Sequence, residues 1–454
     1  MSAGNLFRQL ASRESYGSQL GAFALATVLG CAPWLLPALG IAILVWLAGQ
    51  ERDALLFRIL VLYAITFSLI AAGAVQTFGV RFLWDRLYAG DRHSFVPAFC
   101  TLLLPLVGGQ VLLAVVATAG LELPGAVRAA WLGLYAILHG VWLAAFWLGA
   151  VKDHAFTAFA LALGVGLSIP GALAGFQAGG LAGQFLGLAA GYAVSFACLL
   201  SRMVAEFGYS YTFAWRVWAY LPRLFPLFLA GLCYGIGLWA DKFVFWAHPD
   251  TGVAVLGWLR MSPHYDNAVF LASLTIVPAL GLFLMHMDTE FGDRYREIFA
   301  TIGRHAPLSE IVAARERALA CFHAGLGFVL RLQAPLALGI ALFAAEIMSR
   351  LGISWLGLFA FRYSVVAMLL QLIHLVALIA LIYFDFRKSA LLLGGAFLVA
   401  QVAGAWLSIG FGPGLHGLGG LVANGLVAVL GIAVLEAKTG RLEYHVFRRQ
   451  VAGA

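Results

Sequence analysis

The stretch ALLFRILVLYAITFSLIAAGAVQTFGV, residues 54–80, is followed directly by RFLWDRLYAGDRHS, residues 81–94. The first segment has one charged side chain, Arg58, and the second has five. An α-helix rises 1.5 Å per residue, so about 20 apolar residues cross the hydrocarbon core of a bilayer. The two segments therefore predict a transmembrane helix that ends in a charged segment outside the membrane.

The composition of the whole chain also indicates that lipid surrounds most of it. The chain has 454 residues, of which 63% are hydrophobic and 11% are charged, and its mean hydropathy is +0.93. An ordinary soluble domain has about 25% charged residues, so this chain has too few charges to cover a surface in water. We therefore expect an all-α polytopic membrane protein, with lipid around most of its residues.

About twelve apolar runs of sufficient length follow one another along the chain. The first run is too long for a signal-peptide core, so we expect it to be retained and to be kinked at Pro33 and Pro37. Residues 175–180 form the least marked break. The predicted spans are 20–46, 54–80, 96–121, 124–148, 155–175, 179–203, 222–246, 268–287, 325–348, 353–384, 390–411 and 415–435.

Positive charges fall mainly in every second gap between these runs. If the N-terminus is cytosolic, the inside segments hold 20 Lys and Arg residues. The outside gaps hold only Arg52, Arg58, Arg128, Arg260 and Arg350. Cytosolic segments carry such an excess, so the pattern predicts an even number of spans and two cytosolic termini. The net charge of +7 then reflects topology and gives little reason to expect nucleic acid as a partner.

Two charged segments, residues 81–94 and 288–323, follow the second and the eighth span. Six spans separate them, which suggests two parallel six-helix lobes, 1–203 and 204–454, the latter with a basic cytosolic tail. Two unrelated interfacial helices are the alternative. If the segments dock a partner protein, the charged residues expected to bind it are Arg81, Asp85, Arg86, Asp293, Arg294 and Arg296.

A glycine recurs every four residues from Gly175, at the end of the fifth run, to Gly191 in the sixth. Such a stripe lets another helix approach closely. Tight packing inside the first half is the simpler interpretation, and a moving seam between the lobes is the alternative.

Polar side chains at membrane depth are costly, so they are candidates for a substrate path. Because adjacent residues point in different directions on a helix, Asp241 and Lys242 are not expected to satisfy each other. Structural alternatives stay open: ion pairs with other helices, arginines that extend to the headgroups, and a hydrogen bond from a neighbouring helix to His374. Deep polar residues of the first half are Gln76, Gln110, His139 and Gln184. The candidates for the path are Asp241, Lys242, Arg331, Arg362, Gln371 and His374.

Motifs of several enzyme classes are absent from the sequence. It contains no GxxxxGK[ST] phosphate loop, no HExxH pair and no GxSxG elbow. We therefore expect no catalytic activity, metal or cofactor. The cysteines show no paired ligand spacing and are interpreted as core thiols: Cys31, Cys100, Cys198, Cys233 and Cys321.

Two blocks of sequence carry a family resemblance. GIGLWADKFVFW, residues 235–246, and SPHYDNAVFLASLTIVPALGLFLMHMDTEFGDRYREIF, residues 262–299, resemble the PelG transporters of the Pel exopolysaccharide system. The resemblance extends over nearly the full chain. It implies membership of the multidrug/oligosaccharidyl-lipid/polysaccharide exporter superfamily, with twelve helices in two six-helix lobes around a central cavity. It transfers no catalytic motif and no proven binding residue.

The same resemblance implies a substrate, partners and a location. The substrate would be Pel, an N-acetylated amino-sugar polymer that the cytosolic glycosyltransferase PelF makes from nucleotide sugars. The partners would be PelF and the membrane proteins PelD and PelE, in the bacterial inner membrane, and PelD binds cyclic di-GMP. The expected function is export of this polymer. One alternative is a flippase for lipid-linked oligosaccharide, in which Lys242, Arg331 and Arg362 bind the phosphate groups. The other is a scaffold that anchors the glycosyltransferase.

Overall fold

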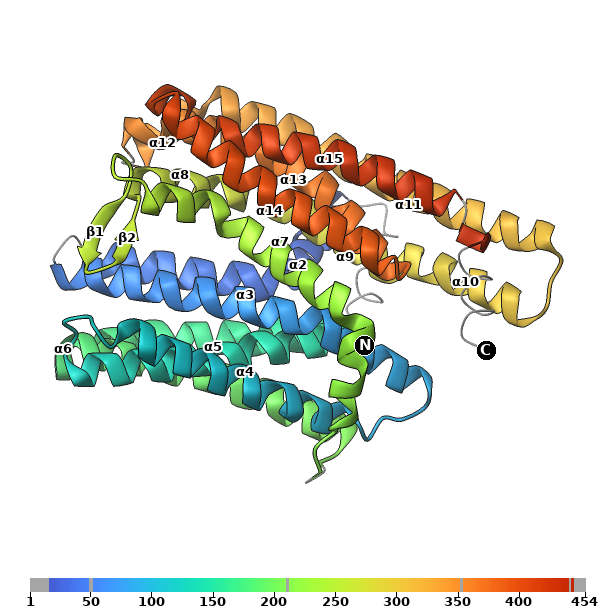
Figure 1. Cartoon of the computed structure of the whole chain (residues 1–454), viewed down its shortest axis with the longest axis horizontal. Helices are drawn as coiled ribbons and strands as arrows, with labels where there is room; N and C mark the ends of the chain where they lie inside the picture. Colours follow the sequence, from blue (N-terminus) through green and yellow to red (C-terminus); the bar gives the residue numbers. More distant parts are fainter. Residues whose placement is uncertain (1–15, 49–51, 210–211, 352–353, 441, 445–454) are drawn as a thin grey trace. The chain divides into compact units, whose positions relative to one another are not determined.

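The computed structural model is almost entirely helical (Figure 1). It describes residues 16–48, 52–209, 212–351, 354–440 and 442–444. The α-helices are α2 (Tyr16–Ala48), α3 (Arg52–Tyr88), α4 (Phe95–Thr118), α5 (Gly125–Ala150), α6 (His154–Phe207), α7 (Arg216–Ala247), α8 (Pro263–Leu274), α9 (Val277–His286), α10 (Gly292–Gly303), α11 (Leu308–Leu342), α12 (Ala344–Arg350), α13 (Leu358–Tyr383), α14 (Arg387–Gly410) and α15 (Leu418–Thr439). The remaining elements are the strands β1 (Val253–Leu256) and β2 (Leu259–Met261), the π-helix η1 (Met287–Phe291), and the 3-10 helices η2 (Trp355–Gly357) and η3 (Pro413–Leu415).

The number of membrane spans follows from the lengths of these helices. Within the described residues, 10 helices are long and apolar enough to cross a membrane, and α8 with Val277–Gly303 forms one further, bent span. Helix α6 has 54 residues, more than twice the required length, and leaves the helical conformation at Gly179 and Gly180. Gly180 has a φ of 57°, which residues with a side chain rarely adopt. Counting α6 as two spans gives the predicted twelve, and its break lies within residues 175–180.

The two halves of α6 pack against each other along the glycine stripe. A Cβ atom on Gly175 would lie 2.1 Å from the carbonyl oxygen of Gly183, and one on Gly187 would lie 2.0 Å from that of Gly171. The backbones therefore touch, and a side chain at either position has no space. The simpler interpretation of the stripe is confirmed, because the contact lies inside the first half of the chain.

Alanine at position 175 is expected to destabilise the protein by about 1–3 kcal/mol, the usual cost of overpacking. The added methyl group meets backbone, which cannot rotate away. Gly166→Ala is the matched control, because its Cβ position on the same helix is surrounded by open space. Thermal unfolding in detergent measures the difference, and equal midpoints for the two variants would contradict the prediction.

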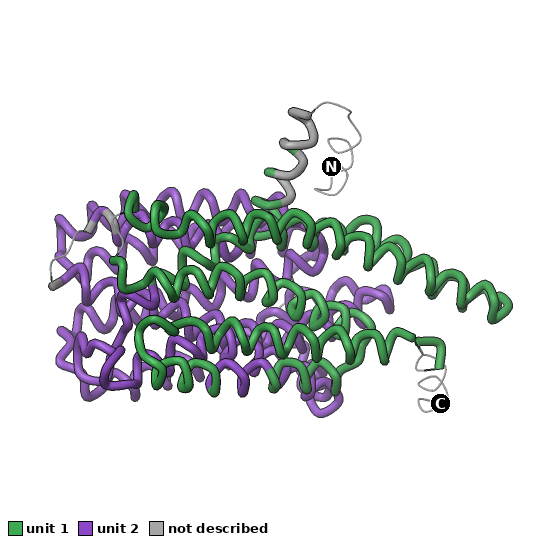
Figure 2. The backbone as a smooth tube through the Cα atoms, turned by 90° about the horizontal axis from the view of Figure 1, so that it is seen from above, with its two compact units in different colours: residues 1–31, 267–396, 403–454 green, residues 32–266, 397–402 purple. Residues whose placement is uncertain are grey.

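Contacts divide the chain into two compact units (Figure 2). Unit 2 contains residues 32–266 and 397–402, and unit 1 contains the residues up to Cys31 with 267–396 and 403–454. In unit 2, α5 packs on α6 and α3, and α3 packs on α7. In unit 1, α13 packs on α11 and α15. The predicted lobes, 1–203 and 204–454, were inferred from two charged segments six spans apart and not from contacts. They stay a prediction.

Several polar groups within the spans form hydrogen bonds inside the protein. The Thr101 and Thr118 hydroxyls donate to backbone carbonyls four residues earlier, at 2.6 and 2.8 Å. The buried Trp142 indole donates to the Ser68 hydroxyl at 2.9 Å. By contrast, Leu112 and Leu113 of α4 are largely exposed. Polar side chains that bond inside and apolar side chains on the surface are typical of helices in lipid, where a donor has no water to bond.

A short hairpin interrupts the helical pattern between α7 and α8. Strands β1 and β2 are antiparallel and pair Val253 with Met261 and Ala254 with Arg260. The sequence predicts only a gap between two spans here, because strands of three and four residues are too short for a marked alternation. The hairpin leads directly into Pro263, the first residue of α8.

Candidate functional site

Asp241 and Lys242 lie near the C-terminal end of α7, within unit 2. The Lys242 ammonium lies 3.4 Å from Asp241 Oδ1, and the Tyr265 hydroxyl donates to Asp241 Oδ2 at 2.8 Å. The two charged side chains are only 13% and 11% exposed. The prediction that these neighbours would not satisfy each other was therefore wrong. The long lysine side chain reaches the carboxylate although the two Cα–Cβ bonds diverge.

A second buried carboxylate, Asp266, lies in the first turn of α8. It accepts hydrogen bonds from the Trp246 indole at 2.9 and 3.0 Å and from the Ser262 backbone N–H at 2.9 Å. Lys242 and Arg58 lie near enough to attract it electrostatically. Asp266 is not among the site residues predicted from the sequence. An acidic residue one turn after a Ser-Pro helix start is the signal that could have identified it.

Aromatic rings surround these charged groups. Tyr63 of α3 stacks on Trp246 with ring centroids 5.1 Å apart, and Phe245 stacks on Tyr265 at 3.7 Å. The Lys242 ammonium lies 5.2 Å from the centroid of the Trp239 ring. Rings exclude water, and a low local dielectric strengthens the hydrogen bonds and ion pairs that they enclose.

The hairpin joins the same group of residues to α3. The Tyr63 hydroxyl donates to the Arg260 carbonyl at 3.0 Å and accepts from the Arg260 N–H at 3.3 Å. The Arg260 guanidinium in turn donates to the Gly252 carbonyl at 2.7 Å. The Asp241/Asp266 cluster, as we name it, therefore connects α3, α7, the hairpin and α8. Its members are Tyr63, Asp241, Lys242, Trp246, Arg260, Tyr265 and Asp266.

In this cluster the buried negative charges are compensated by positive ones, and the group connects several elements. Both carboxylates have protein donors, and both face cationic side chains. Removing a buried charge from such a group is costly, since the opposite charge then lacks compensation. Lys242 has three N–H donors and gives one to Asp241, so its ammonium can also donate to a sugar oxygen.

The two arginines of the predicted path lie on different helices of unit 1. Arg331 lies beyond the midpoint of α11, is exposed, and donates from Nε to the Gly327 carbonyl at 3.1 Å. Arg362 lies near the start of α13 and is half-buried. Its Nε has no hydrogen-bond partner among the residues that the structure describes. Arg362 therefore has a buried donor that an anion or a sugar could use.

His374 is fully buried in unit 1 and contacts a neighbouring helix. Its Nε2 lies 3.2 Å from Oδ1 of Asn424 on α15, and the Asn424 amide donates to the Gly420 carbonyl at 2.8 Å. The structural alternative given for His374 is therefore the observed arrangement. Gln371, three residues earlier on α13, is half-buried, and its place in a path stays a prediction.

The first predicted docking segment begins within α3. Arg81 and Asp85 form an ion pair at 3.4 Å, and the Arg86 guanidinium donates to the Tyr220 hydroxyl at 3.0 Å. The segment contributes Phe82, Arg86 and Asp91 to a groove of about 380 Å³ whose other wall includes Trp215 and Arg216. The groove thus combines cationic and aromatic side chains on unit 2.

The second predicted docking segment contains α10. Asp293 pairs with Arg296, and Glu297 pairs with Arg294 at 3.2 Å and with Arg317 of α11 at 2.7 Å. These ion pairs are largely exposed and contribute little to stability. They do present a row of charges on the α10 surface, as a docking surface requires.

A family model matches nearly the entire sequence. Residues 4–447 match the model described as "PelG: Putative exopolysaccharide Exporter (EPS-E)". The chain belongs to the PelG family. The resemblance seen in residues 235–246 and 262–299 is thereby confirmed, and the PelG-family chain is a multi-pass membrane protein of exporter type. Among curated proteins, no match is found.

Solved structures with the same fold include a multidrug resistance transporter and other MATE structures. An outward-facing MATE family transporter of the MOP superfamily has a TM-score of 0.69 and 16% identity, covering 98% of this chain and 97% of its own. MATE in the straight conformation has a TM-score of 0.68 and 16% identity, covering 98% of each chain. MATE in the bent conformation has a TM-score of 0.67 and 16% identity, covering 98% and 99%. Identities this low show the fold alone, and these transporters have twelve helices in two lobes, as predicted for the PelG-family chain.

Two polar residues of the first half, Gln110 and His139, have hydrogen-bond partners within the protein. The His139 Nδ1 lies 2.7 Å from the Tyr135 carbonyl oxygen, and the Tyr135 hydroxyl donates to Gln110 Oε1 at 2.7 Å. Gln184 is buried within α6. These groups provide internal hydrogen bonds for the PelG-family fold, and none of them adds a charge.

Proposed function

We propose that this chain exports Pel, an N-acetylated amino-sugar polymer, from the cytosol to the periplasm across the bacterial inner membrane. The match of residues 4–447 to an exopolysaccharide exporter family carries the proposal. The likeness to transporters over 98% of the chain supports it. The excess of positive charges in alternate segments supports a topology with both termini in the cytosol.

The proposed path is a central cavity between the lobes 1–203 and 204–454. Before deacetylation the polymer is uncharged, so its path needs hydrogen-bonding groups and aromatic faces more than strong charge. The half-buried Gln371 and the remaining donors of Lys242 suit such a substrate. The other residues proposed to line the path are Asp241, Arg331, Arg362 and His374.

The location of the polymer tests this function. Matched cells with an active synthase, containing or lacking this chain, are fractionated, and amino-sugar polymer is measured in the cytosol and periplasm. Polymer that is retained in the cytosol only when the chain is deleted supports export. Loss of all polymer, with the glycosyltransferase released from the membrane, would favour the scaffold function instead.

One observation favours a flippase for lipid-linked oligosaccharide as the second candidate. The Nε of Arg362, which has no hydrogen-bond partner among the described residues, is a buried donor of the kind that binds diphosphate. Under the export proposal, replacing Lys242, Arg331 and Arg362 together by glutamine should lower export of neutral polymer by less than about tenfold, because glutamine keeps an N–H donor for a sugar oxygen at each position. The periplasmic polymer of folded variants measures this. A loss above about a hundredfold would favour a diphosphate substrate.

The partners are proposed from the same family. PelF would dock on residues 81–94 and 288–323, and PelD and PelE would assemble beside it in the membrane. The charged surface of α10 and the groove of about 380 Å³ near Arg86 support docking of a cytosolic enzyme. Reversing the charges of Arg81, Arg86 and Arg294 should release PelF from membranes, whereas retention of PelF by this variant would exclude these surfaces.

A further inference from the structure

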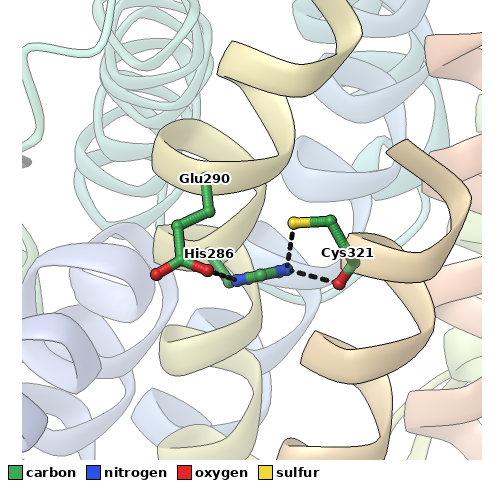
Figure 3. A group of neighbouring side chains, drawn as sticks. All are labelled: His286, Glu290 and Cys321. Carbon is green, nitrogen blue, oxygen red and sulfur yellow. Dashed lines mark hydrogen bonds and ion pairs between the residues drawn. The ribbon is translucent and has the colours of Figure 1, made fainter. Parts of the chain in front are cut away.

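Three side chains with metal-binding atoms meet at the junction of α9, η1 and α11 (Figure 3). His286 is the last residue of α9, Glu290 lies in η1, and Cys321 faces them from α11. The His286 ring lies between the other two: its Nδ1 is 3.5 Å from Glu290 Oε2, and its Nε2 is 3.8 Å from Cys321 Sγ. One ligand atom from each residue lies within 4.8 Å of the others.

The backbone around the histidine fixes the position of its ring. The Cys321 carbonyl oxygen lies 3.1 Å from Nε2. A Cβ atom on Gly325, one turn after Cys321, would lie 2.3 Å from the same nitrogen, so only glycine leaves room for the ring there. Glu290 belongs to a π-helix, and such turns are frequent at functional sites although they are rare overall. The imidazole is therefore held against the face of α11 that carries the cysteine.

We propose that His286, Glu290 and Cys321 bind a zinc ion, with a fourth position open to water. A thiolate and an imidazole together favour zinc over magnesium or calcium, which prefer oxygen ligands. Zinc bonds of 2.0–2.3 Å place tetrahedral ligand atoms roughly 3.3–3.8 Å apart. The 3.8 Å between Sγ and Nε2 already has this size. Only one ring nitrogen can bind the ion, and Nε2 is the one that faces Cys321. The Glu290 carboxylate is 71% exposed, so its side chain can leave Nδ1 and approach an ion held by Nε2.

The bound ion would connect the bent span that contains α9 to the following span, α11. Binding displaces the thiol proton of Cys321 to solvent and forms the zinc–sulfur bond. The sequence predicts core thiols and no metal, because the ligands come from α9, η1 and α11 and 35 positions separate His286 from Cys321. Only the fold brings them together.

Cobalt(II) titration of the purified full chain, after removal of metals with a chelator, tests the site. Cobalt takes the place of zinc and gives a thiolate-to-cobalt charge-transfer absorption when a cysteine binds it. Wild type is expected to bind one equivalent with this absorption, and zinc is expected to displace the cobalt. Cys321→Ser is expected to lose the absorption, and Glu290→Gln to bind at least about tenfold more weakly. Cys198→Ser, at a half-buried cysteine of α6, is the matched control and should behave like wild type.

A second measurement needs no variant and therefore no assumption about folding. Zinc should slow alkylation of Cys321 in the wild-type protein at least about tenfold, and it should leave alkylation of Cys198 unchanged. Absence of the cobalt absorption in wild type, its survival in Cys321→Ser, or equal alkylation of Cys321 with and without zinc would each overturn the proposal. Its failure would leave the export function untouched, since neither experiment measures transport.

Discussion

Asparagine in place of Asp241 should lower the free energy of unfolding by about 3 kcal/mol. The variant leaves the Lys242 ammonium, 13% exposed, without the carboxylate that lies 3.4 Å away. The amide oxygen can still accept the Tyr265 hydroxyl, so the loss comes mainly from the missing charge. Asp266 moderates the loss because it also attracts Lys242. Thermal unfolding of the purified protein in detergent measures the effect.

A double variant identifies the cause of this loss. Asp241→Asn combined with Lys242→Met removes both charges and should recover most of the stability, since a missing pair is tolerated better than a single buried charge. Asp53→Asn, at an exposed carboxylate in the first turn of α3, is the control and should be near neutral. If the double variant were as unstable as Asp241→Asn, the ion pair would not be the source of the loss.

The number of spans could be predicted because lipid leaves few options. A chain inside the hydrocarbon core must satisfy its backbone within helices, so apolar runs of about 20 residues become helices almost without exception. Even the unusual α6 follows this rule, since the break at Gly179 and Gly180 lies in the predicted interval. The same reasoning placed the glycine stripe at a close helix contact.

The chemistry of individual sites was harder to predict, since it depends on contacts distant in sequence. Asp266 accepts a hydrogen bond from Trp246, 20 residues earlier, and no local sequence pattern predicts that contact. His374 has the expected depth, but its hydrogen-bond partner, Asn424, lies on α15. Lys242 was predicted not to pair with Asp241 because their Cα–Cβ bonds diverge. Its four-carbon side chain nevertheless brings the charge to the carboxylate. Helix patterns thus locate polar residues but do not assign their partners.

Asparagine in place of Asp266 should loosen the start of α8 and cost about 3 kcal/mol. The carboxylate accepts from both the Trp246 indole and the Ser262 N–H, which approach the same buried group. An asparagine amide has only one oxygen acceptor, so its NH₂ group would face one of these donors. A buried donor that loses its acceptor costs about 1–3 kcal/mol, and the lost charge near Lys242 adds to this.

Hydrogen exchange at the Ser262 amide separates this local effect from general instability. In Asp266→Asn the acceptor of this amide loses its charge and its hydrogen bond weakens, so the amide should exchange at least about tenfold faster, while amides in the middle of α5 keep their wild-type rates. Asp250→Asn is the matched control, because that carboxylate lies near the same hairpin and is 84% exposed. Unchanged exchange at Ser262, together with an unchanged unfolding midpoint, would show that Asp266 does not hold the hairpin and α8 together. Faster exchange throughout unit 2 would instead assign the carboxylate to the stability of the whole helix bundle.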